Sequence, residues 1–234
     1  MKITENIEML EVHIPRGDDE MIIYPTLAWD DSHLVLFDTG VPGSGSYFAE
    51  AIEKTGHKAE NLTDIILTHQ DIDHIGGAKE LLALAPKAKV YAHEVDTPFI
   101  NGVKMPTKLE KQENRLANGE IAATDGFYQM LKNGFATSFL PVDVELKDGD
   151  ILDFCGGIET VFTPGHTPGH AAFYLKSGRT MVVGDAANIA ENGALRGSNP
   201  GMTWDMDKAE HSLEKIKSYD LANVISYHTG YLKF

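Results

Sequence analysis

Short runs of apolar residues, separated by polar and glycine-containing segments, recur along this chain. They are rich in valine, isoleucine and aromatic residues, which is typical of β-strands with one or both faces buried. The runs that fit this pattern are MIIYPTLAW, HLVLFD, DIILTH, KVYAH, ILDF, IETVFTP, AAFYL, TMVVGD and NVISYH. So many separate runs predict a strand-rich protein.

Three segments instead carry apolar residues at helical spacing. They begin near Ser46, near Gly77 and after Asp205. In the third segment Ala209 and Leu213 are four positions apart, so their side chains share one face of a helix. Helices that alternate with strands predict layered sheets covered by helices rather than a helical bundle.

The strand pattern fades between about residues 98 and 141, where the sequence is helical or looped. A long segment without strands inside a compact domain is more often functional than idle, commonly as a lid over a site. The segment contains Phe127, Tyr128, Met130, Phe135 and Phe139. These side chains either line a pocket or pack the insertion onto its own domain, and we favour packing for any one of them.

Composition and charge narrow the possible classes of protein. The 234 residues are 42% hydrophobic and 24% charged, which fits a globular chain with a sizeable core. A formal net charge of -15 argues against a nucleic-acid-binding face, because proteins that bind phosphates concentrate lysine and arginine.

The cysteine content and the N-terminal sequence bear on the cellular compartment. The single cysteine, Cys155, cannot form an intramolecular disulfide, and MKITENIEML lacks the apolar core of a signal peptide. No run approaches the ~18 apolar residues that a membrane helix needs. We therefore expect a soluble, cytoplasmic protein without a membrane partner.

The segment THQDIDHIGG, residues 68–77, concentrates polar groups after an apolar run. In an extended chain His69, Asp71 and Asp73 would share one face. His74 follows at the strand end. Imidazoles and carboxylates that converge on one point indicate a metal site, because a divalent cation offsets both the repulsion and the desolvation of the carboxylates.

Further residues of the types that bind metals follow other apolar runs. VFTPGHTPGH supplies His166 and His170, MVVGDA supplies Asp185, and VISYH supplies His228. A single histidine at such a position is usually structural. Several independent strand ends that deliver histidine or aspartate indicate a shared site, which would require the chain to close as one domain.

The order of these motifs resembles that of the metallo-β-lactamase superfamily. The family pattern is His-x-His-x-Asp-His, then a histidine after glycine, an aspartate after a strand, and a late histidine. HQDIDH, TPGHTPGH, GDA and SYHTG match it in order, and LFDTG around Asp38 matches an earlier family motif. The resemblance covers nearly the whole chain. It implies an αββα sandwich of two mixed β-sheets flanked by helices, formed by a single domain over residues 1–234, with the 98–141 insertion near the active site.

The resemblance also implies a role for each matched residue. One ion would be held by His69, Asp71 and His166, a second by Asp73, His74 and His228, and Asp185 would bridge the two. A water or hydroxide between the ions would be the nucleophile, because the cations lower its pKa toward ~7. Asp73 is also a candidate to orient that nucleophile. Asp38 and His170 would lie behind the ligands, Asp38 as a carboxylate that orients them and His170 as a supporting residue.

Asp71 departs from the family pattern, which has histidine at this position. With two divalent ions and a hydroxide, the three aspartates make the formal charge of the core zero, whereas histidine would leave one positive charge. The added carboxylate should make the bound water less acidic and shift the preference from zinc, the usual metal of the family, toward Mn or Fe. Alternatively, Asp71 weakens the first site and leaves one tightly bound metal.

Fold and metal site do not choose among the substrates of the family. TPGHTPGH resembles glyoxalase II, and we expect a hydrolase that uses a metal-bound hydroxide to cleave a small ester, lactone or thioester. A phosphodiesterase or nuclease is one alternative, since HQDIDHIGG resembles the metallo-hydrolase domain of competence DNA-uptake proteins. A non-enzymatic metal-binding or sensing protein is another. The expected partner is a small-molecule substrate rather than nucleic acid, and a dimer remains open.

Overall fold

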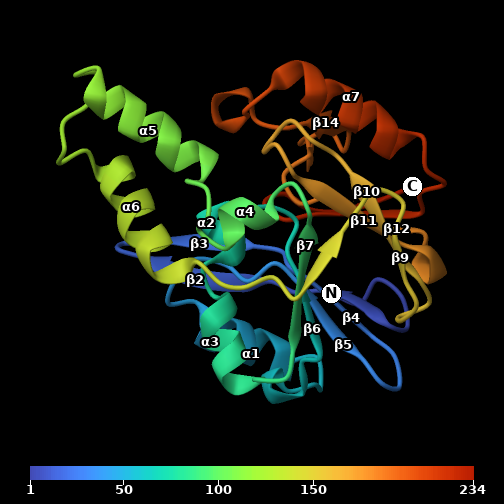
Figure 1. Cartoon of the computed structure of the whole chain (residues 1–234). Helices are drawn as coiled ribbons and strands as arrows, with labels where there is room; N and C mark the ends of the chain where they lie inside the picture. Colours follow the sequence, from blue (N-terminus) through green and yellow to red (C-terminus); the bar gives the residue numbers. More distant parts are fainter.

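Two six-stranded mixed sheets form the centre of the computed structural model, which describes residues 1–234 (Figure 1). The first sheet has the order β1 (Ile7–Met9), β4 (Thr26–Trp29), β5 (Leu34–Phe37), β6 (Asp64–Ile66), β7 (Lys89–His93) and β8 (Val144–Leu146). The second has the order β16 (Gly230–Lys233), β15 (Asn223–Ser226), β12 (Thr180–Val182), β11 (Ala171–Leu175), β10 (Ile158–Phe162) and β9 (Ile151–Leu152). Strands β5 to β8 are parallel, as are β12 and β15, so both sheets are mixed.

Buried apolar residues form three layers. The middle layer joins the inner faces of the two sheets, for example through Phe37 of β5 and Phe173 of β11, whose ring centroids are 5.6 Å apart. A second layer lies between the first sheet and helices α1 (Gly45–Glu53) and α3 (Ala78–Leu84). A third lies between the second sheet and helix α7 (Met206–Lys217). This order of layers confirms the predicted αββα sandwich.

Helical spacing located the three covering helices to within a residue or two, because each buries one apolar stripe. The run MIIYPTLAW, in contrast, is not one strand. It divides at Pro25 between β3 (Asp19–Ile23) and β4, since proline has no N–H to donate to a strand ladder. Two small hairpins were not predicted: β2 (Val12–Arg16) with β3, and β13 (Ala187–Ile189) with β14 (Leu195–Gly197).

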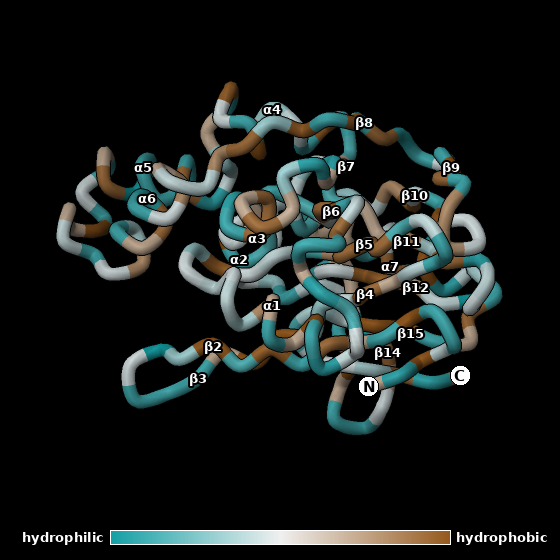
Figure 2. Tube along the Cα trace, turned by 90° about the horizontal axis from the view of Figure 1, so that it is seen from below, coloured by the Kyte–Doolittle hydropathy of each residue, from teal (hydrophilic) through white to brown (hydrophobic).

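The segment from about 98 to 141 is mainly helical and contains most of α4 (Thr97–Ile100) together with α5 (Thr107–Ala117) and α6 (Gly126–Ser138). Figure 2 shows α5, α6 and the β2–β3 hairpin projecting from the same side of the molecule. Tyr128 and Phe135 are buried in the core, and Phe139 stacks on Phe135. Phe127 and Met130 are exposed. None of the helices combines the length and the apolar character that crossing a membrane requires.

Candidate metal centre

The segment 68–77 folds in two parts, and this decides how its side chains point. Asp71 has extended backbone angles and precedes the short helix α2 (Ile72–Ile75). The predicted alternation therefore holds only as far as Asp71, and the expectation that Asp73 shares its face in an extended chain is wrong. Each helical residue rotates the side chain by about 100°, so Asp73 and His74 lie in a second position.

The predicted ligand residues come together as two groups. Within each group, every residue offers one nitrogen or oxygen atom that could bind a metal, and these atoms all lie within 4.8 Å of one another. The first group comprises His69, Asp71, His166 and Asp185, and the second comprises Asp73, His74 and His228. In the first group, Asp71 Oδ2 lies 3.0 Å from His69 Nε2 and 2.9 Å from His166 Nε2. In the second group, His228 Nε2 lies 3.3 Å from Asp73 Oδ2.

Asp185, which follows strand β12, lies between the two groups. Its Oδ2 is 3.2 Å from His166 Nε2 in the first group. Its Oδ1 is 3.4 Å from both His74 Nε2 and His228 Nε2 in the second group. One carboxylate therefore faces both positions, which is the arrangement that a bridging role requires.

Asp38, at the end of β5, fixes the orientation of His74. Its carboxylate accepts hydrogen bonds from the backbone N–H and the hydroxyl of Thr68, and lies 2.8 Å from His74 Nδ1. With Nδ1 engaged in this way, Nε2 of His74 points at the ligand group, where it is buried without a hydrogen-bond partner. Donor atoms held in this manner fit a metal ion.

His170 supports the centre from behind and does not belong to either group of ligand atoms. Its Nδ1 lies 2.9 Å from the hydroxyl of Thr163, and its Nε2 accepts the backbone N–H of Asp185 at 3.1 Å. Gly184 passes so close that a Cβ there would lie 2.8 Å from His170 Nε2. His170 therefore holds the backbone from which Asp185 projects.

Among the residues near the ligands that were not predicted, two are charged. Asp96, just before α4, accepts hydrogen bonds from the backbone and side chain of Gln70, from Thr167 Oγ1 and from the backbone of Gly169. It thereby ties the 68–77 segment to the loop of His166. In the sequence it resembles an ordinary residue before a short helix that carries proline in its first turn, so no pattern distinguished it.

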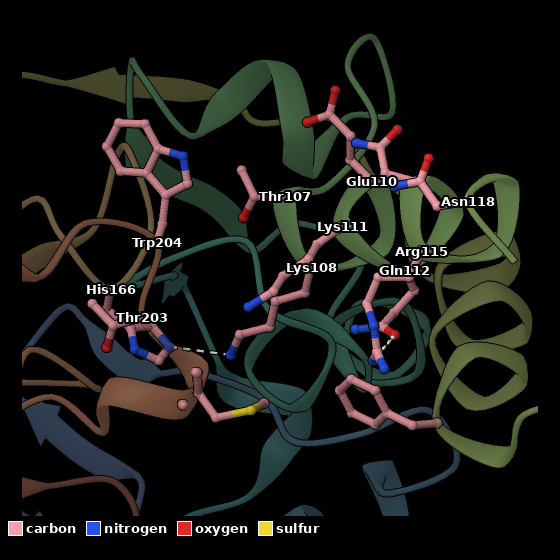
Figure 3. A pocket seen from close by; sticks show the side chains of 14 residues that line it. Thr107, Lys108, Glu110, Lys111, Gln112, Arg115, Asn118, His166, Thr203 and Trp204 are labelled. Carbon is pink, nitrogen blue, oxygen red and sulfur yellow. Dashed lines mark hydrogen bonds between the residues drawn. The ribbon is translucent and has the colours of Figure 1, made fainter. Parts of the chain in front are cut away.

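The second unpredicted residue is Lys108, from helix α5. Its ammonium contacts Asp71 Oδ2 and lies 3.2 Å from His166 Nε2, as the dashed line in Figure 3 shows for the latter. Its side chain is only 16% exposed. The sequence offered no signal, because Lys108 is one of several charged residues in a polar helical segment.

Burial alone would raise the pKa of Asp71, but the ammonium of Lys108 and the imidazole of His69 outweigh it and hold the pKa well below its usual value. Burial would lower the pKa of His228, but the carboxylates of Asp185 and Asp73 raise it to about 10. The carboxylates are thus ionised and stabilised by neighbouring cations. A divalent ion that displaces the proton of His228 would likewise stabilise the ionised carboxylates.

Two cavities open onto this centre. One, of about 440 Å³, is lined by one face of α5, by His166 and by residues 201–204, and we call it the polar cavity (Figure 3). The other, of about 450 Å³, is lined mainly by apolar residues of the β2–β3 hairpin and α6, and reaches Asp71 and Asp73; we call it the apolar cavity. Lys108, Phe127 and Met202 line both.

Comparison with known sequences gives one family. A family model described as the metallo-beta-lactamase superfamily matches residues 19–228. The Bacillus subtilis (strain 168) protein YobT is 27% identical over 200 residues, which are 81% of this chain and 76% of that protein. A hydroxyacylglutathione hydrolase of Francisella tularensis subsp. novicida is 30% identical over 197 residues, which are 84% of this chain and 58% of that protein.

Solved structures agree in fold. A metallo-beta-lactamase family protein of Thermus thermophilus matches 99% of this chain and 76% of its own, with a TM-score of 0.76 and 21% identity. BJP-1, a subclass B3 metallo-beta-lactamase of Bradyrhizobium japonicum, matches 97% of this chain and 76% of its own, with a TM-score of 0.64 and 21% identity. At these identities the likeness establishes the sandwich fold.

Proposed function

This chain belongs to the metallo-β-lactamase superfamily, and we propose that it is a metal-dependent hydrolase of a small ester, lactone or thioester. One observation carries the proposal: ligand-type side chains from four strand ends converge beside two small cavities, of which the polar cavity reaches His166 and the apolar cavity reaches Asp71 and Asp73. A divalent ion in such a centre supplies an activated water and polarises a carbonyl oxygen. Zinc is the metal typical of the family, and Asp71 as a metal ligand would favour Mn or Fe as alternatives.

The protein's own residues would divide the remaining work. Asp38 orients His74, and His170 positions Asp185 through its backbone. Asp73 is the candidate to orient the attacking water, because its side chain is 25% exposed and lines the apolar cavity, whereas that of Asp71 is 2% exposed. A reacting group in that cavity would therefore meet Asp73 first.

The two cavities support a small substrate. Sites for small molecules commonly measure about 300–1,000 Å³ and combine apolar walls with a few polar groups. The net charge of -15 disfavours long nucleic acids. The named activity of the hydroxyacylglutathione hydrolase, which this chain matches over 58% of that protein's length, supports a thioester among the candidates.

A substrate panel tests the proposal. The purified protein would be assayed with Zn, Mn and Fe against a thioester, a lactone and bis(p-nitrophenyl) phosphate. Turnover of a carbonyl ester with at least one metal is the expected result. Cleavage of the phosphodiester alone would indicate a phosphodiesterase or nuclease instead, and no turnover with any metal would favour a metal-binding or sensing protein.

The variant Asp185→Asn tests the bridging position. We expect a sharp loss of bound metal, measured by elemental analysis, because an amide lacks the charge that both ligand groups face. Asp220→Asn is the matched control, since Asp220 is exposed and pairs only with Arg179 at the surface. Wild-type metal content in Asp185→Asn would refute the bridging role.

A further inference from the structure

The ammonium of Lys108 lies where a cation of the first ligand group would be expected. It contacts Asp71 Oδ2 and lies 3.2 Å from His166 Nε2, and these two ligand atoms are themselves 2.9 Å apart. Asp71 Oδ2 also lies 3.0 Å from His69 Nε2. The ammonium nitrogen of Lys108 thus contacts Asp71 and His166, two residues that the sequence pattern assigned as metal ligands.

The fold holds Lys108 in this position. The residue before it, Thr107, donates its backbone N–H to the side-chain oxygen of Gln70 at 2.8 Å, and Gln70 lies between two predicted ligands. Leu109 and Gln112 are buried, so the first turns of α5 are packed against the protein. A largely buried ammonium requires a countercharge, and Asp71 supplies it.

The second ligand group differs from the first. No lysine or arginine forms an ion pair with Asp73 or Asp185. His74 Nε2 is buried without a hydrogen-bond partner, and so is Asp185 Oδ1, which faces it at 3.4 Å. Asp71 Oδ1 in the first group is also unpaired. In the first group, by contrast, Asp71 Oδ2 already has three nitrogen partners. The second group therefore offers unpaired donor atoms to an ion, whereas the central oxygen of the first group is occupied.

Formal charge gives the same asymmetry. The centre contains three carboxylates, those of Asp71, Asp73 and Asp185. One divalent ion together with the ammonium of Lys108 neutralises them. A second divalent ion in the first group would lie beside that ammonium, and two positive charges so close together in a largely buried site repel each other.

We propose that Lys108 takes the place of one of the two ions that the family pattern implies, so that this protein binds one divalent ion tightly, in the second group. Asp185 then binds that ion through Oδ1, and its Oδ2 faces the first group without a second ion to bridge. Asp71 then has a physical reason to replace histidine, because a carboxylate supplies the countercharge that the ammonium needs and a neutral imidazole does not. Lys108 also lines both cavities, so its ammonium is placed to donate a hydrogen bond to a substrate oxygen.

Metal counting tests this proposal without any substrate, so its outcome is independent of the proposed hydrolase activity. Metal-free protein would be titrated with Zn(II) against a chromogenic chelator, and bound metal would be counted after gel filtration. We expect about one tight equivalent for the wild type and about a twofold rise for Lys108→Met, because removal of the ammonium opens the first group. Lys108→Arg, which keeps the charge, should stay at one.

Lys111→Met is the matched control, since Lys111 lies one turn further along α5, is exposed and is not among the ligand groups. It should bind the same single equivalent as the wild type. Electron paramagnetic resonance of the Mn(II)-loaded protein gives a second measurement. We expect the spectrum of an isolated ion for the wild type and that of a spin-coupled pair of ions for Lys108→Met. Two tight equivalents in the wild type would overturn the proposal even if Lys108→Met failed to fold, and an unchanged count in a folded Lys108→Met would overturn it as well.

Discussion

Replacing Tyr227 with phenylalanine would remove one oxygen atom from beneath the metal centre. The Tyr227 hydroxyl donates to the backbone oxygen of Asp73 at 2.9 Å and accepts the backbone N–H of Gly40 at 3.0 Å. Its ring packs on His74, with ring centroids 4.1 Å apart. Phenylalanine preserves that ring contact and loses both hydrogen bonds, so the substitution isolates their contribution.

The cost follows from the two backbone groups left without partners. The bond to Gly40 is buried, and an unsatisfied buried donor costs about 1–3 kcal/mol. The bond to Asp73 is only partly buried, so its loss should cost about 1 kcal/mol. We therefore expect Tyr227→Phe to lower the free energy of unfolding by about 2–4 kcal/mol, and Tm by roughly 4–8 °C for a chain of this size.

Urea denaturation of the metal-free protein, followed by circular dichroism, measures this loss. Tyr174→Phe is the matched control, because the Tyr174 hydroxyl donates to the Asp220 backbone oxygen at an exposed position. Its loss should stay within about 0.5–1 kcal/mol. Equal losses in the two variants would show that the Tyr227 hydroxyl does not brace the segment that carries Asp73.

Two further predictions concern buried groups that are not ligands. Asp96→Ala removes the acceptor of four hydrogen bonds. It should therefore lower the free energy of unfolding by about 3–5 kcal/mol and reduce the amount of bound metal. A loss below ~1 kcal/mol in urea denaturation would contradict the role of Asp96 in holding the two loops together. Burial, with Asp30 and Asp64 nearby, raises the pKa of the Cys155 thiol to about 12. Because only the thiolate reacts, alkylation of the folded protein should be slow at pH 8 and accelerate about tenfold per pH unit toward pH 10; a rate at pH 8 equal to that of the urea-unfolded chain would refute this.

Local pattern sufficed for much of the fold. Most apolar runs became strands and the three periodic segments became the covering helices, because burial of one face requires its own period in each kind of element. The prediction failed where one residue changed the backbone, as at Pro25, and at the β2–β3 and β13–β14 hairpins. Strands β3, β13 and β14 are short and only partly buried, so their sequences carry little alternation. In β2 the alternation is limited to Val12, His13 and Ile14, which is too short a run to stand out.

For the candidate site, the sequence by itself determined which residues are available: histidines and aspartates placed where strands end. The structure brings all seven predicted ligands together, and their role toward a metal stays a prediction. Only the tertiary structure decided that α2 turns Asp73 away from Asp71 and that α5 places Lys108 against Asp71. The physical reason is that β6 ends in the first sheet and β10, β12 and β15 end in the second, so stacking the two sheets brings these strand ends to one edge of the sandwich. The position of a side chain from an inserted helix depends instead on how that helix packs, and no periodicity in the chain encodes that packing.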